Sequence, residues 1–208
     1  MIVELITQTF LIVLLLSFSF GPSFFALINT GIKSGYRTGS VLAMGIVLSD
    51  FLLCLIIILF VHSITTFIEN EKNQHFMGIM AGLILVVFGA FYFKRPVSKS
   101  DEVIEVQKPS VPAMLLKGFF LNSVNPSVWL LWLGNVTAIS KTLNNSIVNM
   151  IIYFSITLGI VLFLLFGMVS VAEKVKAILT VKVMHTINLI TGALLIIFGL
   201  VLIYNHYF

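Results

Sequence analysis

One acidic residue, Asp50, lies deep inside an apolar stretch of this chain, at the end of Gly45-Ile46-Val47-Leu48-Ser49. A charged aspartate at the centre of a membrane helix costs on the order of 3 kcal/mol, so we expect its side chain to face the interior of a helix bundle. There the carboxylate can take up and release a proton, or accept the ammonium group of a substrate. The alternative is an aspartate that hydrogen-bonds to a neighbouring Ser or Asn and only fixes the packing.

Two prolines interrupt apolar stretches at corresponding places in the two halves of the chain, in Phe20-Gly21-Pro22-Ser23 and in Val124-Asn125-Pro126-Ser127. A proline inside a helix removes a backbone hydrogen bond and clashes with the preceding turn. Within a bilayer, such a break is tolerated only where it faces protein or an aqueous cavity. Taken singly, each proline is a kink repaired by nearby Ser or Asn; a matched pair is typical of the substrate site of a small transporter.

Polar side chains accompany both breaks. Ser19 and Ser23 flank the first, and Asn122 and Asn125, three residues apart, are predicted to share a helical face at the second. A broken helix exposes N–H groups, which attract a carboxylate, and carbonyl groups, which attract a cation. Two breaks beside one acid suit a small zwitterion such as an amino acid. The predicted substrate-binding or ion-binding residues are therefore Asp50, Gly21, Pro22, Ser19, Ser23, Asn122, Asn125 and Pro126.

These groups are predicted to lie at similar depth. Pro22 is about 15 Å of helix from Lys33, and Asp50 is about 20 Å from Arg37. Pro126 is roughly 18 Å into its own span. In a hydrocarbon core about 30 Å thick, all three fall near the midplane, where they could converge on one site.

The composition excludes a water-soluble fold, because 59% of the 208 residues are hydrophobic and only 10% are charged. Soluble domains carry roughly a quarter charged residues. Six apolar runs are long enough to span a bilayer at about 20 residues each. They cover residues 3–30, 38–62, 75–93, 114–138, 147–171 and 184–204.

The basic residues predict the orientation of these spans. Of the 12 Lys and Arg residues, only Lys72 and Lys141 fall on one side of the six spans. By the positive-inside rule the other side is cytoplasmic, so both termini are predicted to lie outside the cytoplasm. The pI near 9.3 follows from this asymmetry and does not indicate nucleic-acid binding.

An internal repeat sets the predicted architecture. Residues 80–89 (MAGLILVVFG) resemble residues 190–199 (ITGALLIIFG), with glycines seven apart in both. Such glycines let a neighbouring helix backbone approach closely. Each half then holds three spans, and because three is odd, the second half enters the membrane upside down. We predict an all-α membrane protein of six transmembrane helices in two inverted three-helix repeats, residues 1–93 and 114–208, joined by a cytoplasmic linker at 94–113.

The motifs also resemble those of the LysE/RhtB family of bacterial amino-acid exporters, and the resemblance covers nearly the whole chain. It rests on Gly21-Pro22-Ser23-Phe24-Phe25, Gly31, Gly35-Tyr36-Arg37-Thr38-Gly39, Gly45 to Asp50, and Asn122-Ser123-Val124-Asn125-Pro126. It implies a cytoplasmic-membrane protein that exports amino acids or similar metabolites, driven by the proton gradient.

Three positions depart from the family pattern. Phe20 replaces the first proline of Pro-Gly-Pro, Ser49 replaces the glycine before the acidic residue, and Ser127 replaces the lysine of Asn-Pro-Lys. Without that lysine, a cationic partner for Asp50 or for a substrate carboxylate is missing. Basic amino acids therefore cannot be inferred as substrates from the resemblance.

The sequence thus predicts a transporter rather than an enzyme, with no cofactor, whose partners are the lipid bilayer, a small-molecule substrate such as an amino acid, and the proton. A homodimer stays open. One alternative is a cation or metal exporter, although the spans offer a single acid and no His cluster as ligands. Another is a scaffold subunit, which predicts a midplane packed without a cavity. Trp129 and Trp132 are interpreted as packing residues, with a place in a cavity wall as the alternative.

Overall fold

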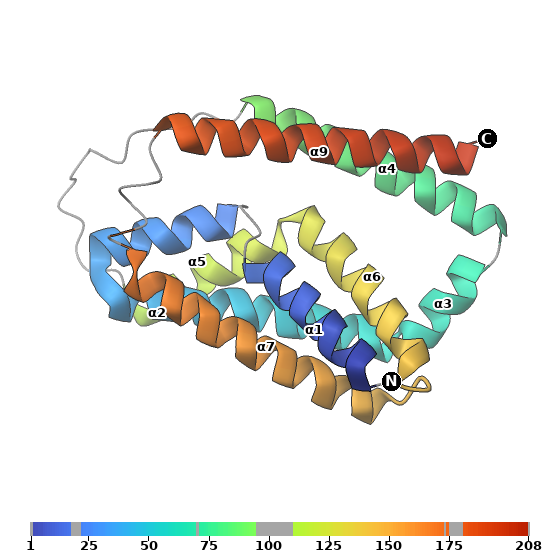
Figure 1. Ribbon diagram of the computed structural model, residues 1–208, viewed down its shortest axis with the longest axis horizontal. Coiled ribbons are helices and arrows are strands. Elements are labelled where there is room, and N and C mark those ends of the chain that lie inside the picture. Colours follow the sequence, from blue (N-terminus) through green and yellow to red (C-terminus); the bar gives the residue numbers. More distant parts are fainter. Residues whose placement is uncertain are drawn as a thin grey trace. The chain divides into compact units, whose positions relative to one another are not determined.

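The computed structural model describes residues 2–17, 22–69, 71–94, 110–172, 174 and 181–207, and within these ranges the regular structure is helical (Figure 1). The helices are α1 (Ile2–Ser17), α2 (Pro22–Leu59), α3 (Val61–Glu69), α4 (Glu71–Lys94), α5 (Val111–Ser123), α6 (Pro126–Thr142), α7 (Ile147–Ser170) and α9 (Val181–Tyr207).

Both prolines start a new helix. The predicted span 3–30 consists of α1, which ends at Ser17, and the first part of α2, which begins at Pro22. The predicted span 114–138 likewise divides into α5 and α6, and α6 begins at Pro126. Proline suits the first position of a helix, because its φ is already helical and the missing N–H would have no partner there. The predicted interruptions are therefore confirmed, as helix starts rather than kinks.

Helix α2 bends sharply at Gly35, which has φ 78° and ψ 173°. This left-handed region is accessible to glycine at little cost and strains any residue with a Cβ. The bend separates residues 22–34 from residues 36–59, and so divides the first predicted span from the second.

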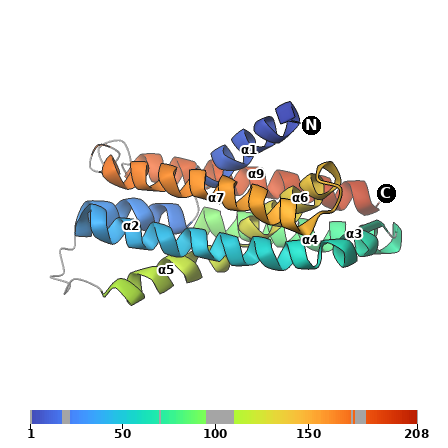
Figure 2. The same ribbon diagram turned by 90° about the horizontal axis from the view of Figure 1, so that it is seen from below.

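One compact unit comprises Met1–Leu59 and Ser100–Ile178 and contains α1, α2, α5, α6 and α7. Figure 2 shows α2 between α5 and α7, and it packs against both. The contact with α5 is close, because a Cβ added to Gly45 or Gly118 would clash with a backbone carbonyl of the other helix. Helices α1, α2, α5 and α7 contribute to the apolar core of this bundle. Its buried residues are Val13, Leu27, Leu42, Ala43, Ile46, Met114, Val161, Leu165 and Val169.

The second compact unit comprises Phe60–Lys99 and Leu179–Phe208 and contains α3, α4 and α9. Helices α4 and α9 lie side by side (Figure 1). A Cβ on Gly82 would be 2.6 Å from the carbonyl oxygen of Gly199, and a Cβ on Gly89 would be 2.7 Å from that of Gly192. The earlier glycine of α4 thus meets the later glycine of α9, and the later glycine of α4 meets the earlier one of α9. The two helices therefore run antiparallel, with their backbones in direct contact.

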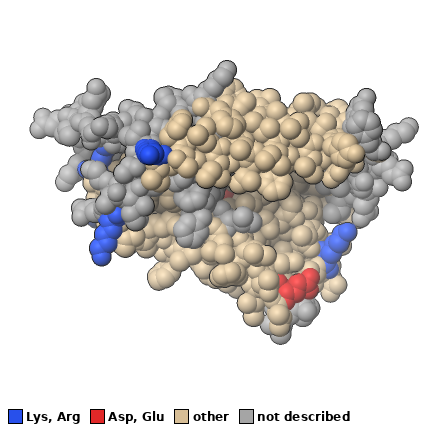
Figure 3. All heavy atoms as spheres, turned by 45° about the horizontal axis from the view of Figure 1, so that its top comes forward, with Lys and Arg blue, Asp and Glu red and all other residues tan. Residues whose placement is uncertain are grey.

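Apolar residues cover much of the described surface. Within the described residues, three helical segments are long and apolar enough to cross a membrane, namely Ser23–Leu59, Ile147–Ser170 and Asn188–Asn205. On the face in Figure 3, side chains other than Lys, Arg, Asp and Glu occupy most of the described area. Exposed apolar side chains along α7 include Val148, Ile152, Ile156 and Phe163. Such a surface is typical of helices that contact lipid.

The compact units do not follow the predicted repeats, since each unit takes helices from both halves of the chain. The division into two three-helix repeats, residues 1–93 and 114–208, stays a prediction. Most of the predicted linker, 94–113, lies outside the described residues.

Candidate functional site at Asp50

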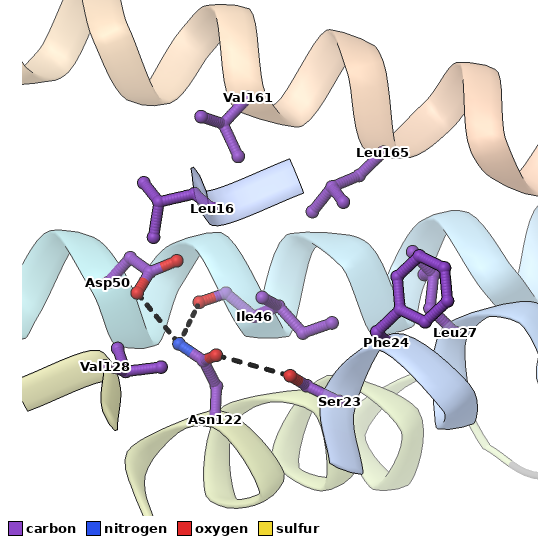
Figure 4. A pocket seen from close by; sticks show the side chains of 10 residues that line it. All are labelled: Leu16, Ser23, Phe24, Leu27, Ile46, Asp50, Asn122, Val128, Val161 and Leu165. Atoms are coloured by element: carbon purple, nitrogen blue, oxygen red, sulfur yellow. Dashed lines mark hydrogen bonds between the residues drawn. The ribbon is translucent and has the colours of Figure 1, made fainter. Parts of the chain in front are cut away.

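Asp50 lies in the second part of α2 with only 2% of its surface exposed. The amide nitrogen Nδ2 of Asn122 donates to its Oδ1 at 2.9 Å, and the indole Nε1 of Trp132 donates to the same oxygen at 2.8 Å. These donors come from α5 and α6, on either side of the second helix break. In Figure 4 the other carboxylate oxygen points away from Asn122. Two short hydrogen bonds therefore hold Oδ1 of the carboxylate, while Oδ2 points away from Asn122.

Asn122 joins three helical segments. Its Nδ2 also lies 3.4 Å from the carbonyl oxygen of Ile46 and 3.4 Å from Ser49 Oγ, both in α2. Its Oδ1 accepts from the hydroxyl of Ser23, just after the first break, at 3.5 Å (Figure 4). A hydrogen bond of 3.5 Å is at the long limit and weak. The strong connection is therefore between Asn122 and Asp50, and Ser23 completes the row of polar groups.

Protein groups satisfy the backbone at the second break. The N–H of Val124 donates to the carbonyl of Phe120, and that of Asn125 donates to the carbonyl of Asn122. The indole of Trp129 donates to the carbonyl of Ser123, the last residue of α5, at 2.7 Å. A break inside a membrane requires such internal partners, because lipid offers none. Trp129 thus has a structural role at the end of α5.

Trp132 connects Asp50 to a row of aromatic residues. Its side chain is fully buried, and its ring meets that of Phe154 edge-on at 5.5 Å. The Phe154 ring lies 5.0 Å from that of Tyr153, whose hydroxyl is 2.8 Å from the hydroxyl of Thr9 in α1. The row therefore links the carboxylate in α2 to α6, α7 and α1.

A small cavity adjoins the carboxylate (Figure 4). Its volume is about 20 Å³, and its lining comes from α1, α2, α5, α6 and α7: Leu16, Ser23, Phe24, Leu27, Ile46, Asp50, Asn122, Val128, Val161 and Leu165. A space of this size holds about one water molecule. The cavity is too small for an amino acid in this conformation.

Among the predicted site residues, the structure brings Asp50, Ser23 and Asn122 together at the cavity. Asn125 is buried but does not line the cavity. The prediction that it shares a helical face with Asn122 is wrong, because α5 ends at Ser123 and Asn125 lies between two helices.

The remaining predicted residues relate to the breaks themselves. Pro22 and Pro126 begin α2 and α6. Ser19 and Gly21 lie outside the described residues. No group of three or more His, Cys, Asp or Glu side chains that could hold a metal ion occurs in the described part of the chain.

The sequence argument missed Trp132 as a partner of Asp50 and interpreted it as a packing residue. The two residues are 82 positions apart, so no local pattern links them. The available signal was a residue type, because a buried tryptophan N–H needs an acceptor and the predicted spans offer one buried carboxylate.

In the described part of the chain, helices that begin at two prolines surround the buried carboxylate of Asp50, and the outer surface is largely apolar. Both features are typical of membrane transport proteins. Residues 14–206 match the family described as LysE type translocator, and the chain belongs to that family. It is 28% identical over 187 residues to a Bacillus subtilis (strain 168) protein named "Putative amino acid efflux protein YcgF", with 88% of each chain covered. No solved structure matches the chain. Family membership and apolar helices together indicate an integral membrane transporter.

Proposed function

We propose that the protein is a secondary transporter that exports amino acids or related small zwitterions across the cytoplasmic membrane, coupled to protons. The observation that carries this proposal is the buried carboxylate of Asp50 on a cavity between two interrupted helices. The name of the Bacillus subtilis relative supports amino-acid efflux as the activity.

In the proposed cycle, Asp50 binds either a proton or the ammonium group of the substrate. Asn122 and Trp132 fix Oδ1, so the orientation of the second oxygen is set before a substrate arrives. The N-terminus of α2, beside Ser23, supplies backbone N–H groups that favour a substrate carboxylate. One wall of the cavity thus provides a partner for each charge of a zwitterion.

The glycine contacts of α4 and α9 support the inverted repeat. In the sequence repeat, Gly82 corresponds to Gly192 and Gly89 to Gly199. A two-fold rotation that exchanges the two helices turns the Gly82–Gly199 contact into the Gly192–Gly89 contact, and the structure contains both. Antiparallel equivalent helices are what halves of opposite orientation require.

The decisive experiment measures efflux from proteoliposomes that contain purified protein and a labelled amino acid, with and without a pH gradient. We expect Asp50→Asn to reduce gradient-driven efflux at least about 100-fold. Loss of one preorganised electrostatic interaction in an active site commonly lowers the rate by about this factor. Asparagine keeps the size of the side chain, so the protein should stay folded.

The matched control is Cys54→Ala, one turn further along α2, where the side chain is 2% exposed and does not line the cavity. This variant should retain efflux, which separates loss of the carboxylate from general disturbance of α2. Unchanged efflux in Asp50→Asn, in protein that elutes as a single folded species, would remove Asp50 from the mechanism.

A further inference from the structure

The cavity at Asp50 has two chemically different sides (Figure 4). Asp50, Asn122 and Ser23 form a polar row along one side. Across from this row lie Leu16 of α1 and Val161 and Leu165 of α7. The site is therefore amphipathic, with all its hydrogen-bonding groups on one wall.

Asp50 is the only charged residue among the ten that line the cavity in the described structure. The described residues of the facing wall, Leu16, Val161 and Leu165, are aliphatic and offer no hydrogen bond from a side chain. A charged group pressed against such a wall would lose its hydration without gaining a partner, which is strongly unfavourable. An aliphatic group there would instead gain from leaving water.

The two walls also differ in how firmly they are held. Hydrogen bonds of 2.8 and 2.9 Å tie the polar row across α2, α5 and α6. At the cavity the apolar wall is held by packing of α1 and α7, which is not directional, and the hydrogen bond between Thr9 of α1 and Tyr153 of α7 lies about two turns away along both helices. Since the cavity of about 20 Å³ must enlarge to admit a substrate, we expect the apolar wall to move and the polar row to stay in place. The enlarged site would then keep an apolar wall opposite the carboxylate.

We infer that this site selects amino acids with an uncharged aliphatic side chain, such as leucine, isoleucine and methionine, over amino acids with a charged side chain. The ammonium group binds at Asp50, and the aliphatic side chain lies against Leu16, Val161 and Leu165. This inference rests on the proposed function and names the substrate class of the same site.

The first test is a counterflow assay in proteoliposomes, with labelled leucine and unlabelled competitors. Isoleucine and methionine should compete as well as leucine to within about tenfold, because apolar side chains of nearly the same volume replace one another at small cost. Lysine and glutamate should compete at least about 100-fold less well, because a buried charge lacks a partner. Lysine or glutamate competing as well as leucine would overturn the inference.

The second test changes the apolar wall. Val161 is 1% exposed and lines the cavity, so Val161→Asp places an acid opposite Asp50. We expect leucine counterflow to fall at least about tenfold and lysine counterflow to appear, because the new carboxylate can pair with the substrate's second ammonium group. Val161→Thr has nearly the same size as valine without a charge, so lysine counterflow should not appear in this variant.

A third variant covers the case in which Val161→Asp does not fold. Val161→Ala enlarges the space next to the apolar wall without adding a polar group. It should therefore shift the preference from leucine toward larger side chains such as phenylalanine. An unchanged ranking in Val161→Ala would contradict contact between the substrate side chain and this wall.

The assays distinguish the two proposals. Counterflow of charged amino acids alone, abolished by Asp50→Asn, would refute the aliphatic preference and leave amino-acid export in place. Absence of counterflow for every amino acid, in folded protein, would refute the proposed function itself.

Discussion

The bundle that contains Asp50 and the α4–α9 pair differ in what they bury. The bundle encloses a carboxylate, amides and hydroxyls between helices that are interrupted at Pro22 and Pro126. The pair consists of unbroken helices of 24 and 27 residues that meet through glycines. Of the buried polar side chains in the described residues, only Asn188 belongs to the pair.

This difference separates binding chemistry from stability. Interrupted helices and buried polar groups are costly in lipid and are retained where they bind something. Close glycine contacts offer no binding chemistry and bring two backbones together. The bundle therefore departs from local folding rules at its site, while the described part of the pair departs from them at the buried side chain of Asn188. Variants that separate loss of transport from loss of stability test this assignment.

The largest effect in the bundle after Asp50 itself is expected from Trp132. Trp132→Phe keeps the ring against Phe154 and removes the N–H that donates to Asp50. A hydrogen bond to a charged group contributes roughly 1.5–3 kcal/mol, which corresponds to a loss of about 10- to 100-fold in kcat/KM for transport. Thermal unfolding should change little by comparison.

The control for this variant is Trp129→Phe, which removes a hydrogen bond to the Ser123 carbonyl and leaves Asp50 untouched. We expect Trp129→Phe to lower stability more than transport. If Trp132→Phe transports like the natural protein, its indole has only the packing role that the sequence suggested.

In the pair, the expected effect is on stability. Gly82→Ala places a Cβ 2.6 Å from the carbonyl oxygen of Gly199, so the backbones must separate. Overpacking of this kind costs about 1–3 kcal/mol, which should appear as a lower melting temperature in detergent. Transport per folded molecule should stay within about twofold, because no part of the cavity lies in α4.

Gly159→Ala in α7 is the matched control, because a Cβ there meets nothing within 4 Å. It should not lower the melting temperature, since alanine is a better helix former than glycine. Equal destabilisation by Gly82→Ala and Gly159→Ala would show that the glycine contacts between α4 and α9 do not contribute specifically to stability.

The smallest effect is expected at Ser23. Ser23→Ala removes a hydrogen bond of 3.5 Å to Asn122, which is too long to contribute much. We expect a change of at most about fivefold in KM, since a typical neutral hydrogen bond contributes about 1 kcal/mol or less. A much larger rise in KM, without a change in stability, would indicate that the Ser23 hydroxyl contacts the substrate directly.

The parts of the site that could be predicted from the sequence depend on local rules. Proline dictates a helix start or break wherever it occurs, so Pro22 and Pro126 indicated both interruptions. An acid within an apolar helix is costly wherever the helix packs, so Asp50 indicated a buried site. Asn125 was misassigned because the sequence did not reveal that α5 ends two residues before it.

Composition, the paired prolines and the single buried acid determined by themselves that this chain is a helical membrane protein with a polar site, because each follows from the cost of polar groups in lipid. The glycines seven apart indicated two close-packing helices but not their partners. Only the tertiary structure decided that Gly82 faces Gly199, that Trp132 donates to Asp50 and that aliphatic side chains lie opposite the carboxylate. These contacts join residues far apart in the chain, and packing of the whole bundle selects them.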